Sequence, residues 1–475
     1  MRDATQVLVI GGGPAGSTAA TLLAREGFDV TLAEREHFPR YHIGESILPS
    51  CLPILDLLGV RQKVEDHGFQ RKGGAYFAWG PEEWSLSFSE LVGERAFAWQ
   101  VIRSEFDQIL LDHAKSQGAH VYEGITVQEV EFSAGRPVAA RWSPSKQASG
   151  GGRISFDFVV DASGRSGILS ARQFKNRRVH DMFRNVACWT YWKGAARLAK
   201  GPDGAIGVCS VPHGWFWVIP LHDGTTSIGL VTSKKIFNQQ RAELGSVEAV
   251  YRAGLEECPT VRDLLTDAEP VAGMKVEQDY SYVCDDFAGP GYMLSGDAAC
   301  FLDPLLSTGV HLASYSAVMA AAGICSVLRG EVAEEEALDF YRGSYRRAYE
   351  RLLVLVSVFY ESYRGRDYHF YNAQRLTHRE QSGLHLQDAF LNIVSGIEDL
   401  DDAQDAALAQ IRKKLAGTGG ANPLADVLHT PGRVPVSPDT AIHGLYLATQ
   451  PQLGLRRAGG QADEDTVLAG ETGKD

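Results

Sequence analysis

The feature that most constrains the fold is a glycine-rich turn near the beginning of the chain. "QVLVI" (6–10) has the composition of a short buried strand, "GGGPAG" follows it, and the next residues repeat Ala and Leu at helical spacing. Gly11, Gly13 and Gly16 form the Gly-x-Gly-x-x-Gly pattern that dinucleotide-binding folds place between a strand and a helix. The chain is therefore expected to be an α/β protein that begins with a Rossmann-like unit.

Each residue of this turn has its own expected task. Gly11 permits the tight turn, Gly13 lets the backbone approach a pyrophosphate, and Gly16 lets the helix pack closely on the strand. Ala15 lies in the first helical turn, whose amides face the negative charge. Glu34 ends the next apolar run, where a carboxylate accepts hydrogen bonds from ribose hydroxyls. The turn alone does not distinguish NAD from FAD.

Two later segments make that distinction. "FVVDASGRSG" (158–167) is an apolar run that ends in Asp161, and "GYMLSGDAACFLDPLLSTG" (291–309) carries Gly296 and Asp297 before a helical pattern. In this order the segments resemble the FAD-binding module of the flavoprotein monooxygenase superfamily, of the GR2 type. The resemblance implies that Asp297 holds the ribityl chain of FAD. It also assigns Asp161, Gly296 and the helix-leading Arg103 to the cofactor site.

A tryptophan-rich stretch, "HGWFWVIPL" (213–221), narrows the family further. In a strand, Trp215, Trp217 and Ile219 share one face, and the residues between them share the other. Core packing alone would account for such a face. However, the stretch matches the W-x-W-x-I-P motif of flavin-dependent halogenases, and "FLDPLLSTG" (301–309) matches their F-x-x-P-x-x-S-x-G motif. The chain resembles this family over roughly residues 5 to 330.

The resemblance implies a definite chemistry. Such an enzyme uses reduced FAD, O2 and chloride or bromide to make hypohalous acid, which then halogenates an electron-rich aromatic. Trp215 and Trp217 would form a partition that keeps the organic substrate from the flavin while a small anion reaches it. Ser307, Thr308 and Gly309 open a predicted helix whose first amides lack intrahelical partners, which suits a bound halide.

The family also implies a lysine between the flavin and the substrate. It follows a G-E-S-x-L-P segment, here Gly44 to Pro49, whose Glu45 and Ser46 are assigned to the cofactor side. Lys72 is the expected catalytic lysine, and Lys63, in a predicted helix, is the alternative. A desolvated lysine has a lowered pKa and becomes a usable nucleophile.

One position departs from the tryptophan halogenases, which carry a glutamate directly before S-T-G. Leu306 occupies that position and cannot act as a base. We therefore expect a phenol or a pyrrole as substrate, either free or tethered to an acyl or peptidyl carrier protein, rather than free tryptophan.

Composition sets the remaining limits. A net charge of −13 disfavours nucleic-acid binding. The seven cysteines show no CxxC or CxxH spacing, so they indicate neither a metal site nor a disulfide framework and favour a reduced, cytoplasmic setting. No signal-peptide pattern is visible. The longest apolar run, residues 309–328, contains His311 and is expected to be a buried helix rather than a membrane span.

The expected organisation has three parts. Residues 1–335 form a discontinuous FAD-binding domain, in which about 186–284 supply a substrate-facing β-sheet. Residues 336–450 form a C-terminal helical or lid region, and 451–475 a disordered tail.

Three functions remain open at this stage. The main hypothesis is a two-component halogenase of natural-product (antibiotic) biosynthesis that receives reduced flavin from a separate reductase. The alternatives are a hydroxylase of the same fold that consumes NAD(P)H itself, and a non-catalytic flavin-binding protein.

Overall fold

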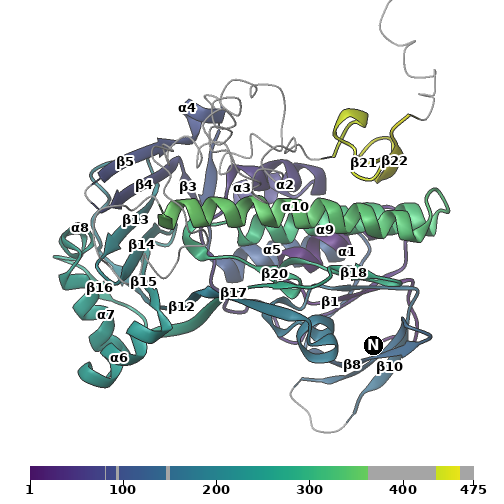
Figure 1. The fold of residues 1–475 in the computed structure, drawn as a ribbon, viewed down its shortest axis with the longest axis horizontal. Coiled ribbons are helices and arrows are strands. Elements are labelled where there is room, and N and C mark those ends of the chain that lie inside the picture. The colour runs from purple at the N-terminus through teal and green to yellow at the C-terminus, as the bar shows by residue number, and fades with distance from the viewer. Residues whose placement is uncertain (81, 93–95, 146–149, 362–434, 460–475) are drawn as a thin grey trace, which may run out of the picture.

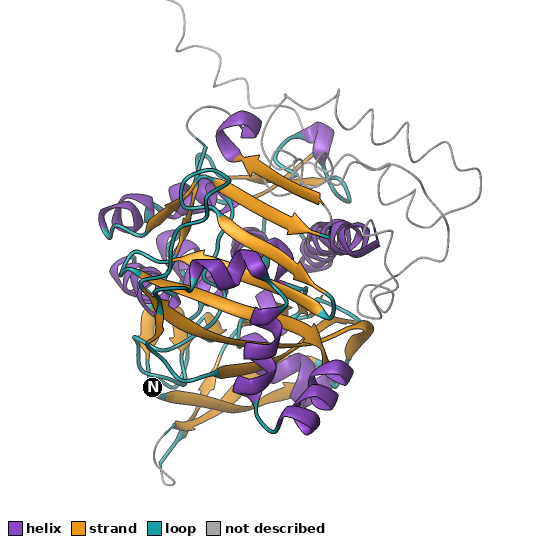
Figure 2. Ribbon diagram, turned by 90° about the vertical axis from the view of Figure 1, so that its left-hand side faces the viewer, coloured by secondary structure: helices purple, strands orange, loops and turns teal. Residues whose placement is uncertain are grey.

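A computed structural model describes residues 1–80, 82–92, 96–145, 150–361 and 435–459 of the chain. Two β-sheets carry the architecture, and helices pack around both of them (Figures 1 and 2). One sheet is mostly parallel and belongs to the nucleotide-binding half. The other is mostly antiparallel and faces it across the cavity described below.

The parallel sheet has the strand order β18-β19-β11-β1-β2-β7, with β18 antiparallel at one edge. Its strands are β1 (Val7–Ile10), β2 (Val30–Ala33), β7 (His120–Tyr122), β11 (Phe158–Asp161), β18 (Ala288–Gly289) and β19 (Tyr292–Leu294). Every residue of β1, β2 and β11 is buried, as expected of parallel strands covered on both faces. The predicted Rossmann-like fold is confirmed.

Helices and a small sheet cover the parallel sheet. Helix α1 packs against both α5 and α9, and α10 packs on α9 (Figure 1). These helices are α1 (Pro14–Arg25), α5 (Arg103–Ser116), α9 (Gly309–Leu328) and α10 (Glu334–Glu361). The antiparallel strands β8 (Ile125–Ser133), β9 (Arg136–Pro144) and β10 (Gly152–Ser155) contact the sheet through β8 and β9.

Helix α9 is the predicted buried helix. Among the described residues it is the one helix long and apolar enough to cross a membrane, with a mean hydropathy of 1.5. However, 94% of that apolar window is buried inside the protein. Its neighbours α1 and α10 cover it, so the packing accounts for its apolar character.

The second sheet contains nine strands, in the order β20-β17-β12-β15-β14-β13-β4-β5 with β16 paired to β12. Their bounds are β4 (Gly74–Trp79), β5 (Glu82–Ser87), β12 (Arg177–Lys193), β13 (Ile206–Val211), β14 (Gly214–Pro220), β15 (Thr225–Ser233), β16 (Glu269–Pro270), β17 (Lys275–Cys284) and β20 (Cys300–Phe301). The sheet therefore reaches beyond the predicted range 186–284. Strand β4 joins it in parallel beside β13 because its aromatic run is buried almost throughout.

The two faces of β14 point into different cores, as its alternation predicts. Trp215, Trp217 and Ile219 belong to the large core that the sheet shares with the nucleotide-binding half. Phe216 and Val218 belong to a smaller core under the outer helices α6 (Lys234–Leu244), α7 (Val247–Glu256) and α8 (Pro259–Leu264).

Short elements connect the two halves. Strand β3 (Gln70–Lys72) pairs with β6 (Ala98–Gln100), and Gly73 alone separates β3 from β4. The helices of this part are α2 (Leu52–Leu58), α3 (Arg61–Asp66) and α4 (Phe88–Val92).

The C-terminal part differs from the prediction at its far end. Helix α10 agrees with the helical pattern, and residues 362–434 of the predicted helical region lie outside the described residues. Strands β21 (Leu445–Ala448) and β22 (Gly454–Arg457) form a hairpin on α9. Leu453 and Leu455 are buried there, and the Leu455 amide donates to Ser326 Oγ at 2.8 Å. Residues 451–459 are therefore folded rather than part of a disordered tail.

Candidate active site

A cavity of about 460 Å³ lies between the two halves of the molecule. Gly11, Gly13 and Glu34 line it from the nucleotide-binding half, and Trp215 and Trp217 line it from the antiparallel sheet. The beginning of α9 also lines the cavity. Residues from each sequence motif that predicts FAD or halide binding are therefore part of its lining.

The glycine turn has the shape that a pyrophosphate requires. Gly11 has a φ of +106°, and a Cβ there would overlap the carbonyl oxygen of Ala162. A Cβ on Gly16 would overlap the Gly11 carbonyl, so only glycine lets α1 approach the turn this closely. Glu34 Oε2 accepts a hydrogen bond from the Gly12 amide at 2.6 Å, which fixes the carboxylate at the cavity. These residues fit the ADP portion of FAD.

Arg103 is the first residue of α5 and lines the cavity. Its guanidinium donates to both carboxylate oxygens of Asp107, at 2.8 and 2.9 Å, and to the Ile43 carbonyl at 2.9 Å. Burial alone would raise the pKa of Asp107, but Arg103 and Arg40 lower it below its usual value. The arginine is therefore a buried, paired cation that anchors the loop before Glu45.

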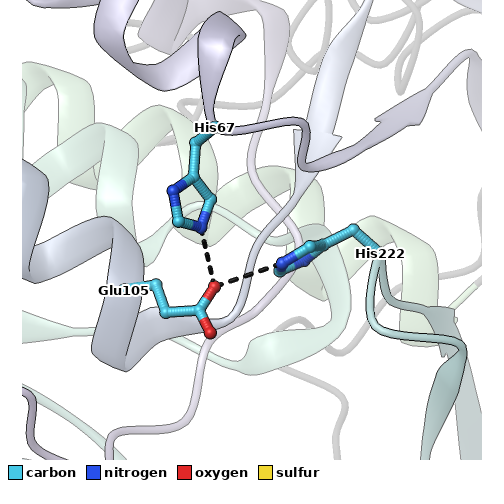
Figure 3. Close-up of side chains that lie close together, drawn as sticks. All are labelled: His67, Glu105 and His222. Carbon is cyan, nitrogen blue, oxygen red and sulfur yellow. Dashed lines mark hydrogen bonds and ion pairs between the residues drawn. The ribbon is translucent and has the colours of Figure 1, made fainter.

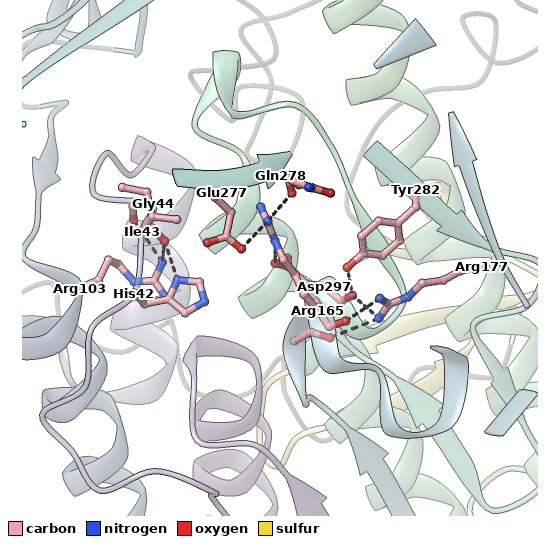
Figure 4. A network of polar contacts seen from close by, with 12 residues as sticks. His42, Ile43, Gly44, Arg103, Arg165, Arg177, Glu277, Gln278, Tyr282 and Asp297 are labelled. Atoms are coloured by element: carbon pink, nitrogen blue, oxygen red, sulfur yellow. Dashed lines mark hydrogen bonds and ion pairs between the residues drawn. The ribbon is translucent and has the colours of Figure 1, made fainter. Parts of the chain in front are cut away.

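Asp297 lines the cavity at the opposite side (Figure 4). Its backbone carbonyl accepts hydrogen bonds from the Tyr282 hydroxyl at 2.6 Å and from Arg177 at 3.2 Å. Arg165 lies 4.0 Å from the Asp297 carboxylate and donates to Glu277 at 3.0 Å. Tyr282 and Arg177 thus fix the backbone of the Gly296-Asp297 turn through its carbonyl. The Asp297 side chain lines the cavity, where its carboxylate can contact a ligand.

Asp161, assigned to the cofactor from sequence, is not among the residues that line the cavity. One carboxylate oxygen accepts from the Ser163 amide at 3.0 Å and the other from the Leu169 amide at 2.7 Å. Its side chain is fully buried in these bonds. Asp161 therefore shapes the loop 162–169, and Ser163 and Gly164 of that loop line the cavity instead.

Three indoles rather than two form the tryptophan face. The Trp215 and Trp217 rings lie 6.3 Å apart, and Trp189 of β12 lies 5.9 Å from Trp217. Gly229 of β15 is the register partner of both Trp189 and Trp217, and a Cβ there would overlap the Trp217 indole. Because Gly229 has no side chain, the Trp217 indole can lie over the backbone of β15.

The predicted halide residues lie together at the beginning of α9. Ser307 takes a left-handed φ of +58°, Thr308 caps the helix, and Gly309 is its first residue. All three line the cavity, where the first amides of the helix lack intrahelical partners. Asp303 braces the preceding turn, because it accepts from the Leu305 amide at 3.0 Å and from Asn185 at 2.9 Å.

Lys72 is almost fully buried beside the cavity rather than in its lining. The β3–β6 pair places it against the segment 44–49, where Nζ donates to Ser46 Oγ at 2.7 Å and to the Ile47 carbonyl at 3.0 Å. Ser46 lines the cavity, so one hydroxyl connects the lysine to it. Desolvation by burial lowers the pKa of Lys72 to about 7. A lysine in this environment is partly neutral at physiological pH.

Glu45 is a further buried ionisable group at this site, and it lies in the same segment as Ser46. Tyr191 donates to Glu45 Oε1 at 2.6 Å, and the Tyr191 hydroxyl lies 2.9 Å from that of Tyr41. Glu45 Oε2 is buried without a hydrogen-bond partner. Burial is the largest cause that raises the pKa of Glu45, to about 7.

We expect Glu45 and Lys72 to affect the free energy of unfolding in opposite directions as the pH rises. The pKa of Glu45 rises from 4.5 on folding, so its stabilising contribution is present below pH 4.5 and lost as the pH rises through 7. The pKa of Lys72 falls from 10.5 on folding, so its contribution is present above pH 10.5 and lost as the pH falls through 7. The effect is on the order of 3 kcal/mol for Glu45 and on the order of 5 kcal/mol for Lys72.

Urea unfolding of the wild type and two variants between pH 4.5 and 10 tests this expectation. Glu45→Gln should remove the fall in stability between pH 4.5 and 7, and Lys72→Met the rise above pH 7. If both variants followed the wild-type pH profile, neither group would titrate as described.

Most of the predicted residues meet at this site, and several neighbours escaped prediction. The predicted residues that line the cavity are Gly11, Gly13, Ala15, Glu34, Glu45, Ser46, Arg103, Trp215, Trp217, Gly296, Asp297, Ser307, Thr308 and Gly309. Lys72 and Gly16 lie directly behind the lining. Trp189, Tyr41 and Arg165 were missed. For Trp189 the alternation of "CWTYW" (188–192) was an available signal, because Trp189 and Tyr191 share a strand face.

A Rossmann-type glycine turn, an acid for ribose and a second sheet over one cavity define the class of the protein, an FAD-binding flavoprotein of the monooxygenase type. The profile of the tryptophan halogenase family matches residues 6–96 and 90–395, further along the chain than the resemblance to residue 330. The chain belongs to this family of FAD-dependent halogenases.

Individual relatives agree. A tryptophan 2-halogenase of Chondromyces crocatus is 42% identical, over 96% of this chain and 94% of the relative. A sulochrin halogenase of Aspergillus terreus is 38% identical, over 89% and 80%. Among solved structures, a myxobacterial chondrochloren halogenase superposes with a TM-score of 0.74 at 34% identity, covering 84% of this chain and 92% of the other. The protein is thus a halogenase enzyme.

Proposed function

We propose that this halogenase takes reduced FAD from a separate reductase, and uses O2 and chloride or bromide to make hypohalous acid. It then halogenates an electron-rich aromatic, a phenol or a pyrrole, free or bound to a carrier protein, in natural-product biosynthesis. The observation that carries the proposal is the buried Lys72, held by Ser46 at the cavity wall, with a pKa of about 7.

When bound, reduced FAD supplies two electrons to O2. The halide supplies the other two, so that one oxygen atom leaves as water and the other leaves in hypohalous acid. The amides of Thr308 and Gly309 are the proposed halide ligands, because the α9 N-terminus favours an anion and opens into the cavity. Thr308 is 1% exposed, so a halide there would be largely shielded from water.

The indole face is proposed to separate the flavin from the organic substrate. Trp215, Trp217 and Trp189 are buried, and Trp217 Nε1 is fixed by Ser227 Oγ at 3.1 Å. A packed aromatic wall excludes a ring-sized substrate from the flavin side but not a small molecule such as hypohalous acid. The tryptophans act here as a partition and take no part in bond making.

Lys72 is proposed to deliver the oxidised halogen. Its Nζ can hydrogen-bond hypohalous acid or, when neutral, attack the halogen and release water as a chloramine forms. Transfer of the halogen to the aromatic carbon then displaces a ring proton and restores the amine. Ser46 Oγ and the Ile47 carbonyl fix the direction in which Nζ points.

The substrate class rests on Leu306. This side chain is buried and apolar where tryptophan halogenases carry a glutamate, so the ring must be reactive enough without that base. Phenols and pyrroles meet this condition. The similarity to a tryptophan 2-halogenase makes tryptophan a necessary member of any substrate panel.

We expect halogenated product only when halide is present together with a source of reduced FAD, either a flavin reductase with NADH and FAD or chemically reduced FAD. The assay incubates the purified protein with phenols, pyrroles, tryptophan and carrier-bound thioesters, with chloride, bromide or no halide, and reads product mass. A reaction with chemically reduced FAD and no reductase serves as the control for the partner. The seven free, buried cysteines support a reduced, cytoplasmic setting for these partners.

Two outcomes would contradict the proposal. Products that gain oxygen and never halogen, with NADPH consumed in the absence of a reductase, would indicate the aromatic hydroxylase. A failure to consume O2 with reduced FAD would indicate a non-catalytic flavin-binding protein.

A further inference from the structure

Outside the cavity, three potential metal ligands from distant parts of the chain converge at the protein surface (Figure 3). We propose that His67, Glu105 and His222 bind a divalent transition-metal ion, with Zn²⁺ as the best match. His67 Nε2 lies 2.8 Å from Glu105 Oε2, and His222 Nε2 lies 3.2 Å from the same oxygen. All three ligand atoms lie within 4.8 Å of one another.

The donor set and its spacing suit zinc. Two imidazole nitrogens and one carboxylate are typical ligands of a Zn²⁺ ion that keeps its fourth position for water. Bonds of about 2.1 Å in a tetrahedron place neighbouring ligand atoms about 3.4 Å apart. The distances from Glu105 are slightly shorter, so a small outward movement of the side chains would admit the ion.

The surrounding residues hold the ligands in place before any ion binds. The centre of the Phe69 ring lies 4.4 Å from that of the His67 ring, 5.1 Å from that of the His222 ring and 6.2 Å from that of the Phe106 ring. Glu105 is fixed in the first turn of α5, where its amide bonds to the Ile102 carbonyl. Two rings packed on one buried aromatic lose little freedom on binding, which favours affinity.

The site is also accessible. The side chains of His67, Glu105 and His222 are 33%, 37% and 20% exposed, so an ion can enter from solvent and retain a water. Among the described residues no lysine or arginine pairs with Glu105, whose ion pairs are those with the two histidines. The carboxylate charge is therefore available to a cation.

The ion would connect three segments of the active site. His67 follows the last residue of α3 and precedes Lys72 by five residues. Glu105 follows Arg103 by two residues, and His222 follows Pro220 of the tryptophan strand by two. A bound metal would therefore link the lysine segment, α5 and the β14–β15 turn. This inference does not depend on the proposed function, because it concerns binding of an ion outside the cavity.

Metal titration of the full chain tests the site. After removal of metals by a chelator, we expect one Zn²⁺ per chain by calorimetry and, with Co²⁺, the intense visible absorption of a four-coordinate site. His67→Gln, His222→Gln and Glu105→Gln should each weaken binding roughly 100-fold or more. Zn²⁺ should also raise the unfolding temperature of the wild type and not of these variants.

His120→Gln is the matched control, because His120 is an exposed histidine beside a single carboxylate, Asp29. It should bind Zn²⁺ like the wild type. The absence of saturable binding in the wild type would overturn the proposal. So would binding that survives all three ligand substitutions, since the ion would then occupy another site.

Discussion

Lys72→Met should reduce halogenation roughly 100- to 10,000-fold while FAD binding and the oxidation of reduced FAD by O2 stay near the wild-type level. The reason is the position of Nζ, buried behind Ser46 and outside the cavity lining, so its loss leaves the flavin side intact. Methionine fills nearly the same volume, and it removes a buried amine whose protonation burial opposes. The variant should therefore fold.

Product formation by mass spectrometry and O2 uptake with reduced FAD measure the two halves of this prediction. Lys63→Met is the control, because Lys63 is an exposed lysine whose Nζ lies 3.1 Å from His113 Nδ1, and it is not among the residues that line the cavity. It should halogenate at the wild-type rate. Near-normal halogenation by Lys72→Met would show that another group delivers the halogen.

Gly16→Ala should weaken FAD binding by a factor of about 100, the equivalent of ~3 kcal/mol of overpacking. The added Cβ would overlap the carbonyl oxygen of Gly11, and neither backbone segment can yield without moving the turn from the pyrophosphate position. Because α1 would have to shift from β1, the unfolding temperature should fall as well.

FAD affinity by fluorescence titration, together with thermal unfolding, tests this second prediction. Gly273→Ala is the matched control, since a Cβ there meets nothing within 4 Å. It should leave both measurements unchanged. A folded Gly16→Ala protein with wild-type FAD affinity would show that α1 and the turn can separate without loss of the cofactor site.

Much of the nucleotide-binding half could be predicted because its signals are local. The glycine turn, its flanking strand and helix, and Glu34 follow one another within 34 residues. The burial of α9 and the alternation along β14 likewise depend only on periodicity within one element. Local spacing therefore predicted the glycine turn, Glu34 and the shared face of the tryptophans, and the family resemblance supplied the other cofactor candidates; most of these residues line one cavity.

The missed features depend on contacts between distant segments or on the direction in which one side chain points. Trp189 joins the indole face because β15 lies between β12 and β14, which no local pattern encodes. Asp161 ends a buried strand as predicted, but its carboxylate accepts hydrogen bonds from the amides of Ser163 and Leu169 rather than lining the cavity. The cluster of His67, Glu105 and His222 spans 155 residues and has no recognisable spacing in the sequence.

The entry of β4 into the antiparallel sheet has a mechanical consequence. Lys72 is joined through Gly73 to β4, which is hydrogen-bonded to β13 and through it to the tryptophan strand β14. The lysine and the indoles are therefore attached to one hydrogen-bonded sheet, whereas the glycine turn belongs to the other. Any hinge motion between the halves would widen or narrow the opening over the flavin. The distance between the indoles and the lysine, along which the oxidised halogen is proposed to travel, would stay the same.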